Sequence, residues 1–78
     1  KEQVWDERVW DVEIRVDDPM ASAWVPYAFY LGDTLQHCGV NAIQFVRHAD
    51  GWKILHLIDT RTPAAACDLP ASVTNPDG

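Results

Sequence analysis

Three polar residues that could handle a proton or hold a substrate fall on neighbouring expected strands: His37, Asn41 and Asp59. If these strands pair in the register that their loops suggest, the three side chains share one face with Trp24 and Tyr30. A carboxylate beside a histidine in an apolar cavity orients the imidazole ring and tunes its pKa, which is what acid/base catalysis requires. We therefore predict His37 and Asp59 as catalytic residues, and Trp24, Tyr30 and Asn41 as ligand-binding residues.

The same polar residues also have a purely structural interpretation. Buried hydrogen-bond networks often fix the register of strands without taking part in any reaction. Asn41 can position a substrate, but its amide cannot accept a proton as a general base. On the opposite face, Gln44 and His56 are expected to lie across from one another. They form either a pH-sensitive contact in an interface or an ordinary cross-strand pair, and the second interpretation is favoured.

Cys38 directly follows His37, which suggests a cysteine nucleophile. Neighbouring side chains in a strand point to opposite faces, however, so the histidine cannot easily activate the thiol. We favour a small buried hydrophobic role for Cys38, with a disulfide to Cys67 as the alternative. The Cys/His spacing does not match a zinc site and the glycines form no phosphate-binding motif. We expect neither a metal nor a cofactor.

Composition and charge exclude several classes of partner. The sequence has 78 residues, with twelve acidic against six basic residues and a net charge of −6. Such an acidic chain repels phosphate backbones, so we expect no nucleic-acid partner. No stretch approaches the ~18 uninterrupted apolar residues of a membrane helix, so we expect no membrane association. No signal-peptide pattern opens the sequence, and we expect a cytoplasmic protein.

Alternation of apolar and polar residues predicts a four-stranded antiparallel meander at residues 1–62. Residues 63–78 are rich in Pro, Ala and Asp and predict an irregular C-terminal tail. Pro26 cannot donate a ladder hydrogen bond, so it predicts a sheet edge or a bulge. The expected strands cover residues 9–16, 21–31, 34–48 and 52–60.

Three turns connect these strands. "DDPM" at 17–20 is typical of a turn, and "GD" at 32–33 of a two-residue hairpin loop. "ADG" at 49–51 predicts a three-residue loop with Gly51 in the left-handed region. The resulting register leaves apolar side chains, Trp52 among them, on both faces, so each face should be covered. We expect a homo-oligomer, most simply a dimer through the sheet.

Several short motifs follow one another in the strand region: W-x-P-Y-x-F-Y at 24–30, H-C-G-V at 37–40, G-W-K-I at 51–54 and D-T-R at 59–61. With these motifs the sequence resembles the strand half of the nuclear transport factor 2-like superfamily, and within it the bacterial SnoaL-like and lumazine-binding members. The resemblance implies an α+β cone, in which N-terminal helices lie across a strongly curved antiparallel sheet and enclose a pocket. The sequence contains the strands of such a cone without its helices. Relatives tend to carry aspartate where this sequence has Asn41, and that difference removes a general base.

Two functions follow from these expectations. The first is a nuclear transport factor 2-like domain that binds a small, largely apolar molecule in a cavity, with isomerase-, dehydratase- or cyclase-like chemistry. The second is a non-catalytic oligomerisation or assembly domain that acts through its sheet face. A deep pocket holding His37 and Asp59 within hydrogen-bonding reach would favour the first function, and a sheet face filled by another chain would favour the second.

Overall fold

A computed structural model describes residues 4–74 and consists mostly of one antiparallel sheet of six strands. Helix within this range is limited to one 3₁₀ turn and one α-helical turn. The antiparallel arrangement agrees with the expectation. The number of strands does not, because the described residues form six strands instead of four. The elements are β1 (Trp5–Val9), β2 (Glu13–Asp17), β3 (Met20–Leu31), β4 (Thr34–His48), β5 (Gly51–Asp59), β6 (Thr62–Pro63), η1 (Ala64–Ala66) and α1 (Ala71–Thr74).

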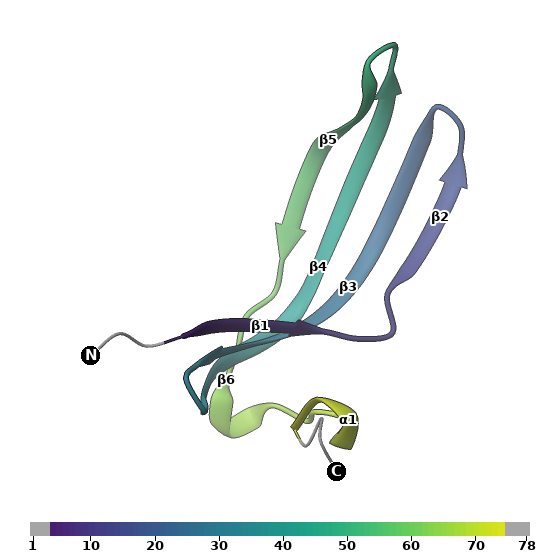
Figure 1. Ribbon diagram of the computed structural model, residues 1–78. Helices are drawn as coiled ribbons and strands as arrows, with labels where there is room; N and C mark the ends of the chain where they lie inside the picture. Colours follow the sequence, from purple (N-terminus) through teal and green to yellow (C-terminus); the bar gives the residue numbers. More distant parts are fainter. Residues whose placement is uncertain (1–3, 75–78) are drawn as a thin grey trace.

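The long hairpin of β3 and β4 forms the centre of the sheet. On its outer sides, β1 and β2 pair with successive halves of β3, and β5 and β6 pair with successive parts of β4. Figure 1 shows both long strands bending, with β2 and β5 beside one end of the hairpin and β1 and β6 beside the other. The curvature is consistent with the expected curved sheet.

The single strand expected at residues 9–16 is divided into β1 and β2, so that expectation was wrong. The chain turns at Asp11, which has a positive φ of 48°, and Trp10 donates a 3.4 Å backbone hydrogen bond to the carbonyl of Pro26. Pro26 has no N–H to offer a strand on that side of β3, and the break between β1 and β2 lies opposite it. The local edge predicted at Pro26 is thereby confirmed.

The turns mostly match the sequence. Asp17 pairs with Met20 across a turn that contains the cis Asp18–Pro19 bond, and Gly32 has a positive φ of 59° in the β3–β4 turn. The loop before β5 differs, because His48 pairs directly with Gly51. It is a two-residue turn rather than the expected three-residue loop, although Gly51 has the expected positive φ, at 124°.

Two irregularities shift the register away from the sequence-based expectation. Between the pairs at Phe29 and Tyr30, β4 contains one extra residue, so His37 pairs with Phe29 instead of Ala28. Between the pairs at Gln44 and Phe45, β5 contains an extra residue, Leu55. An extra residue moves everything beyond it to the opposite face. The expected Gln44–His56 and Asn41–Asp59 pairs are confirmed.

Directly paired residues share a face of a pleated sheet, and this defines two surfaces. We call them the Trp24 face, which carries Trp24, Ala28 and Gln44, and the His37 face, which carries His37, Phe29 and Phe45. The C-terminal segment covers one end of the Trp24 face (Figure 1). The buried cluster there consists of Ala28, Tyr30, Cys38 and Val73, with Trp10, Leu35, Cys67 and Leu69 packed against it.

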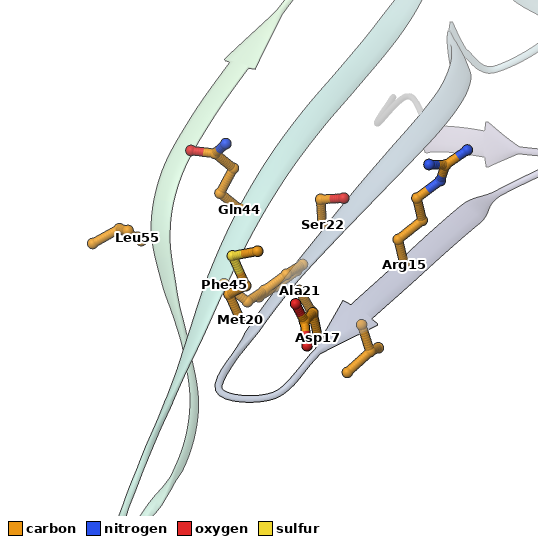
Figure 2. A pocket seen from close by; sticks show the side chains of 9 residues that line it. Arg15, Asp17, Met20, Ala21, Ser22, Gln44, Phe45 and Leu55 are labelled. Atoms are coloured by element: carbon orange, nitrogen blue, oxygen red, sulfur yellow. The ribbon is translucent and has the colours of Figure 1, made fainter.

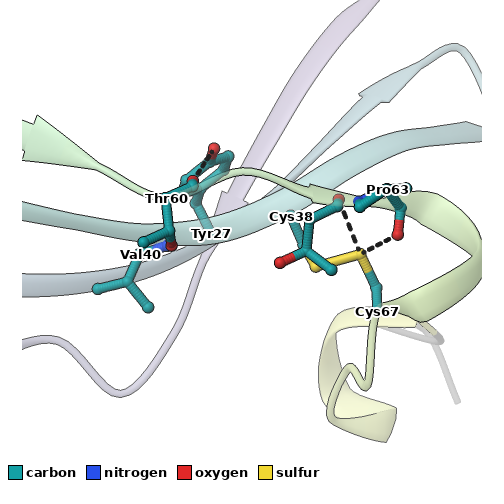
Figure 3. Close-up of a disulfide and its surroundings, with 7 residues drawn as sticks. Tyr27, Cys38, Val40, Thr60, Pro63 and Cys67 are labelled. Carbon is teal, nitrogen blue, oxygen red and sulfur yellow. Dashed lines mark hydrogen bonds between the residues drawn. A yellow bond between two sulfur atoms is a disulfide. The ribbon is translucent and has the colours of Figure 1, made fainter.

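A disulfide and an arginine hold the C-terminal segment in place. Cys38 in β4 is bonded to Cys67, with their Cα atoms 6.2 Å apart (Figure 3). Arg8 donates a 2.6 Å hydrogen bond to the carbonyl of Val73, and its guanidinium lies 3.9 Å from the centre of the Tyr30 ring. The preference for an unpaired Cys38 was therefore wrong. The spacing of the two cysteines in the sequence does not reveal that β6 and η1 bring them together.

Thr60 joins the end of β5 to the centre of the sheet. Its N–H donates to the carbonyl of Val40 and its hydroxyl accepts from the N–H of Val40, both at 3.0 Å. The Tyr27 hydroxyl donates to the Thr60 carbonyl at 2.9 Å (Figure 3). A Cβ added to Gly39 would collide with that carbonyl, so only glycine fits where Thr60 crosses β4.

Many large apolar side chains are exposed at the other end of the sheet. Trp52, which was expected to be buried, is 45% exposed, so that expectation was wrong. Within residues 4–74 nothing covers the sheet between β2 and β5. Over the whole described range, including β1 at the opposite end, the large exposed apolar residues are Val4, Trp5, Val9, Val12, Ile14, Val16, Met20, Trp24, Trp52, Ile54, Leu55, Leu57 and Ile58.

We expect Gly39→Ala to lower the free energy of unfolding by about 1–3 kcal/mol, as overpacked sites do. The new methyl group would push Thr60 away from Val40 and break their paired hydrogen bonds. Urea unfolding followed by circular dichroism measures the loss. Ser22→Ala, at an exposed position of β3, is the control and should be close to neutral. Equal stability of the two variants would show that the close contact is absent.

We expect loss of the Cys38–Cys67 disulfide to lower the free energy of unfolding by about 3–4 kcal/mol, because the bond closes a loop between residues 29 positions apart. Urea unfolding with and without a reducing agent measures this difference. The double variant Cys38→Ala/Cys67→Ala should respond equally in both conditions. A wild-type chain whose midpoint ignores the reducing agent would rule out a stabilising disulfide.

Candidate functional site

The five predicted site residues do not share one face. His37, Asn41 and Asp59 lie on the His37 face, whereas Trp24 and Tyr30 lie on the Trp24 face. The extra residue in β4 causes this separation. It shifts the pairing of β3 with β4 by one residue, so that Trp24 lies opposite Ala42 instead of Asn41. The prediction of one shared face was therefore wrong for Trp24 and Tyr30.

His37 belongs to an aromatic cluster. Its ring centre lies 5.4 Å from that of Phe29 and 5.7 Å from that of Tyr27, and Trp5 packs edge-on against Phe29. Asp59 pairs with Asn41. Asn41 is four residues beyond His37 in β4, which places Asp59 about 13 Å along the strand from His37. In the described range no hydrogen bond joins His37 to Asp59. The expected histidine–carboxylate pair is not formed here, and catalytic roles for both residues stay predictions.

The two aromatic residues predicted to bind a ligand differ in accessibility. Tyr30 is 7% exposed and lies beneath Arg8 in the buried cluster, so its ring is not available to a ligand. Trp24 is 54% exposed and borders a small hollow of about 90 Å³ with Ala42 and Ile58. Of the two, only Trp24 can meet a ligand on the surface.

Two adjoining grooves, of about 450 and 280 Å³, run over β2, β3 and β4, and the larger one also reaches Leu55 in β5. Both are lined by Arg15, Ser22 and Gln44, which Figure 2 shows on three successive strands. Cross-strand pairing continues this row to His56 in β5. We call Arg15, Ser22, Gln44 and His56 the polar row. The sequence predicted the Gln44–His56 pair but not the addition of Arg15 and Ser22. Pairing Asp17 with Met20 across the β2–β3 turn sets Arg15 opposite Ser22 and would have revealed them.

The His37 face carries an apolar patch between β2 and β5. Two neighbouring cross-strand rows of the sheet contribute to it, and neither contains a charged residue. Ile14, Val16 and Ile54 are each more than 60% exposed. We call this surface the apolar patch; its residues are Ile14, Val16, Ala21, Ala23, Ile43, Phe45, Ile54 and Leu57.

One ion pair stands at the end of the sheet. Arg47 donates to both carboxylate oxygens of Asp18, at 2.8 and 2.6 Å, and its backbone N–H donates to the carbonyl of Pro19. The hydrogen bonds from Arg47 lower the pKa of Asp18 below its ordinary value of 3.8, and the same contact raises the pKa of Arg47. This pair attaches the β2–β3 turn to β4.

A metal site and a membrane-spanning helix each place requirements on the described residues. Between residues 4 and 74, no group of three or more His, Cys, Asp or Glu residues is arranged to hold a metal ion. In that same stretch no helix is sufficiently long and apolar to span a membrane.

Comparison with known proteins finds no matching family model, curated protein or solved structure. What the molecule itself defines is a small, disulfide-linked antiparallel sheet with an exposed apolar patch on one face and an exposed polar row on the other.

We expect the Asp18–Arg47 pair to make stability depend on acid pH. Because the folded pKa of Asp18 is lowered, its contribution is present above the unfolded value, about pH 4, and is lost as the pH falls through the folded value. Titration of the Asp18 carboxyl carbon by NMR measures the pKa. Arg47→Gln should raise this pKa, whereas Arg61→Gln, at an exposed position, should leave it unchanged. An identical Asp18 titration in both variants would contradict the pairing.

Proposed function

We propose that this chain is an assembly domain that forms a homodimer by packing its apolar patch against the same patch of a second copy. The observation that carries this proposal is the exposure of the patch. Soluble proteins rarely leave such a contiguous apolar surface in water unless it is an interaction site. The exposure is greatest at the two edges of the patch: Leu57 in β5 is 49% exposed and Val16 in β2 is 63% exposed, whereas Ala23 in β3 is 9% exposed.

The charge distribution favours a second copy as the occupant. Each chain has a net charge of −6, so two copies repel one another except where their contact surfaces carry no charge. The patch meets this condition, because the charged residues Glu13, Arg15 and Lys53 lie on the Trp24 face. The contact is therefore apolar rather than ionic, and raised salt should leave it intact.

The arrangement of the face also fits a dimer. A sheet packed on its own copy places the same residues on both sides of a two-fold axis, as closed homodimers do.

The resemblance to the nuclear transport factor 2-like superfamily forms part of this proposal. The curved antiparallel sheet supports it, since that superfamily uses such a sheet as one wall of a pocket. Binding of a small, largely apolar molecule, with isomerase-, dehydratase- or cyclase-like chemistry, is the second candidate function. The 450 Å³ groove supports it, although the groove lies on an uncovered sheet.

The disulfide bears on where the domain works. Structural disulfides persist in oxidising compartments and are rare in the cytoplasm of ordinary cells. The Cys38–Cys67 bond therefore favours an oxidising compartment over the cytoplasmic location that we expected from the sequence.

Sedimentation velocity at micromolar concentration tests the dimer. We expect the wild-type chain to sediment at twice 8.8 kDa and to do so at raised salt as well. Ile54→Lys should give a monomer, because it buries a charge without a partner in an apolar contact. A compact wild-type species of 8.8 kDa would disprove the proposal.

Ile58→Lys is the matched control. Ile54 and Ile58 belong to the same strand and are 61% and 58% exposed, yet the extra residue Leu55 puts them on opposite faces. Ile58→Lys should therefore remain a dimer. If both variants dissociate equally, the contact does not use the apolar patch.

A further inference from the structure

The polar row gives the Trp24 face a chemistry different from that of the apolar patch. Arg15, Ser22, Gln44 and His56 are directly paired across four successive strands, so their side chains stand side by side. Three strand spacings of about 4.8 Å make the row about 14 Å long. All four side chains are exposed.

The side chains of this row have no hydrogen-bond partner within the described part of the protein, so they face solvent. Among residues 4–74, no hydrogen bond or ion pair joins the side chains of Arg15, Ser22, Gln44 or His56 to another side chain or to the backbone. Together they offer guanidinium and amide donors, an amide carbonyl acceptor, and a hydroxyl and an imidazole that can do either. A ligand that spans the row can thus both accept hydrogen bonds from these side chains and donate hydrogen bonds to them.

An aromatic surface lies beside the polar row. Trp24 occupies the neighbouring cross-strand row, is 54% exposed, and lines the 280 Å³ groove together with Arg15 and Gln44. A flat, partly exposed indole next to hydrogen-bonding side chains suits a ligand with one apolar face and polar edges. Pyranose rings have this character, because their C–H groups gather on one face and their hydroxyls point outward.

The charges of the groove favour a neutral ligand. Glu13 lies next to Arg15 on β2 and lines the same groove, so a positive and a negative side chain stand together. The net charge of −6 further disfavours a phosphate-rich or polyanionic ligand. These charges favour a neutral ligand, and the length of the row favours an extended one.

We propose that the Trp24 face binds a neutral oligosaccharide, with one sugar ring stacked on Trp24 and hydroxyl groups bonded to Arg15, Ser22, Gln44 and His56. This site goes beyond the assembly function and does not depend on it, because it lies on the opposite face of the sheet from the apolar patch. A dimer formed through the apolar patch would present two such sites outward, and they would bind a multivalent glycan with higher apparent affinity.

Isothermal titration calorimetry of the 78-residue chain tests the site, with cellohexaose, chitohexaose and maltohexaose as neutral probes and hexagalacturonate as an acidic probe. We expect at least one neutral probe to bind with a Kd of about 1 mM or below, as befits a shallow, solvent-exposed site. No binding of the three neutral probes, or binding of hexagalacturonate alone, would overturn the proposal.

Two tryptophan variants separate a specific site from general adhesion. Trp24→Ala should weaken binding of the neutral probe about tenfold or more. Trp52→Ala removes an indole that is 45% exposed at the far end of β5, away from the polar row, and should leave the Kd unchanged.

Gln44→Ala removes one member of the polar row and should weaken binding about threefold to tenfold. Equal effects of Trp24→Ala and Trp52→Ala would contradict the proposal, and circular dichroism confirms that each variant is folded.

Discussion

The antiparallel pairing of β3 with β4 is the interaction on which every other part of this molecule depends. The two strands are 12 and 15 residues long, and each of the other four strands pairs only with one of them. The buried cluster is small and lies at one end, so backbone hydrogen bonds rather than core packing hold most of the sheet. A chain of this size with so small a core is only marginally stable in water. The Cys38–Cys67 disulfide adds stability that the core does not supply.

Much of the fold could be predicted because its signals are local. Alternation located the three longer strands, and glycine and proline located their turns. Gln44 and His56 were correctly paired only because two deviations cancel: the turn before β5 is one residue shorter than expected, and the extra residue Leu55 restores the expected register beyond it. The extra residues in β4 and β5 had no comparable signal. Where both faces of a sheet are apolar, slipping by one residue exchanges one set of hydrophobic side chains for another, so the sequence does not penalise the error.

The candidate sites were harder to predict for the same reason. Placing Trp24 and His37 on one face required a continuous register across the β3–β4 hairpin, and one extra residue in β4 separated them. The pairing of Cys38 with Cys67 depends on a crossing of the chain at Thr60, which no spacing rule anticipates. What could be inferred was the unusual abundance of apolar side chains, which indicated surfaces in need of cover.

The disulfide also determines how the domain would behave under mechanical tension. A pull applied beyond Cys67 reaches β4 directly through the covalent bond to Cys38, so β5, β6 and their connections bear no load. The 28 residues enclosed between the two cysteines cannot straighten, which withholds about 95 Å of contour length. Between a pull at β1 and one at the C-terminus, force is therefore borne by the pairing of β1 with β3 and of β3 with β4. As long as the bond is intact, the segment between Cys38 and Cys67 stays out of the path of the force.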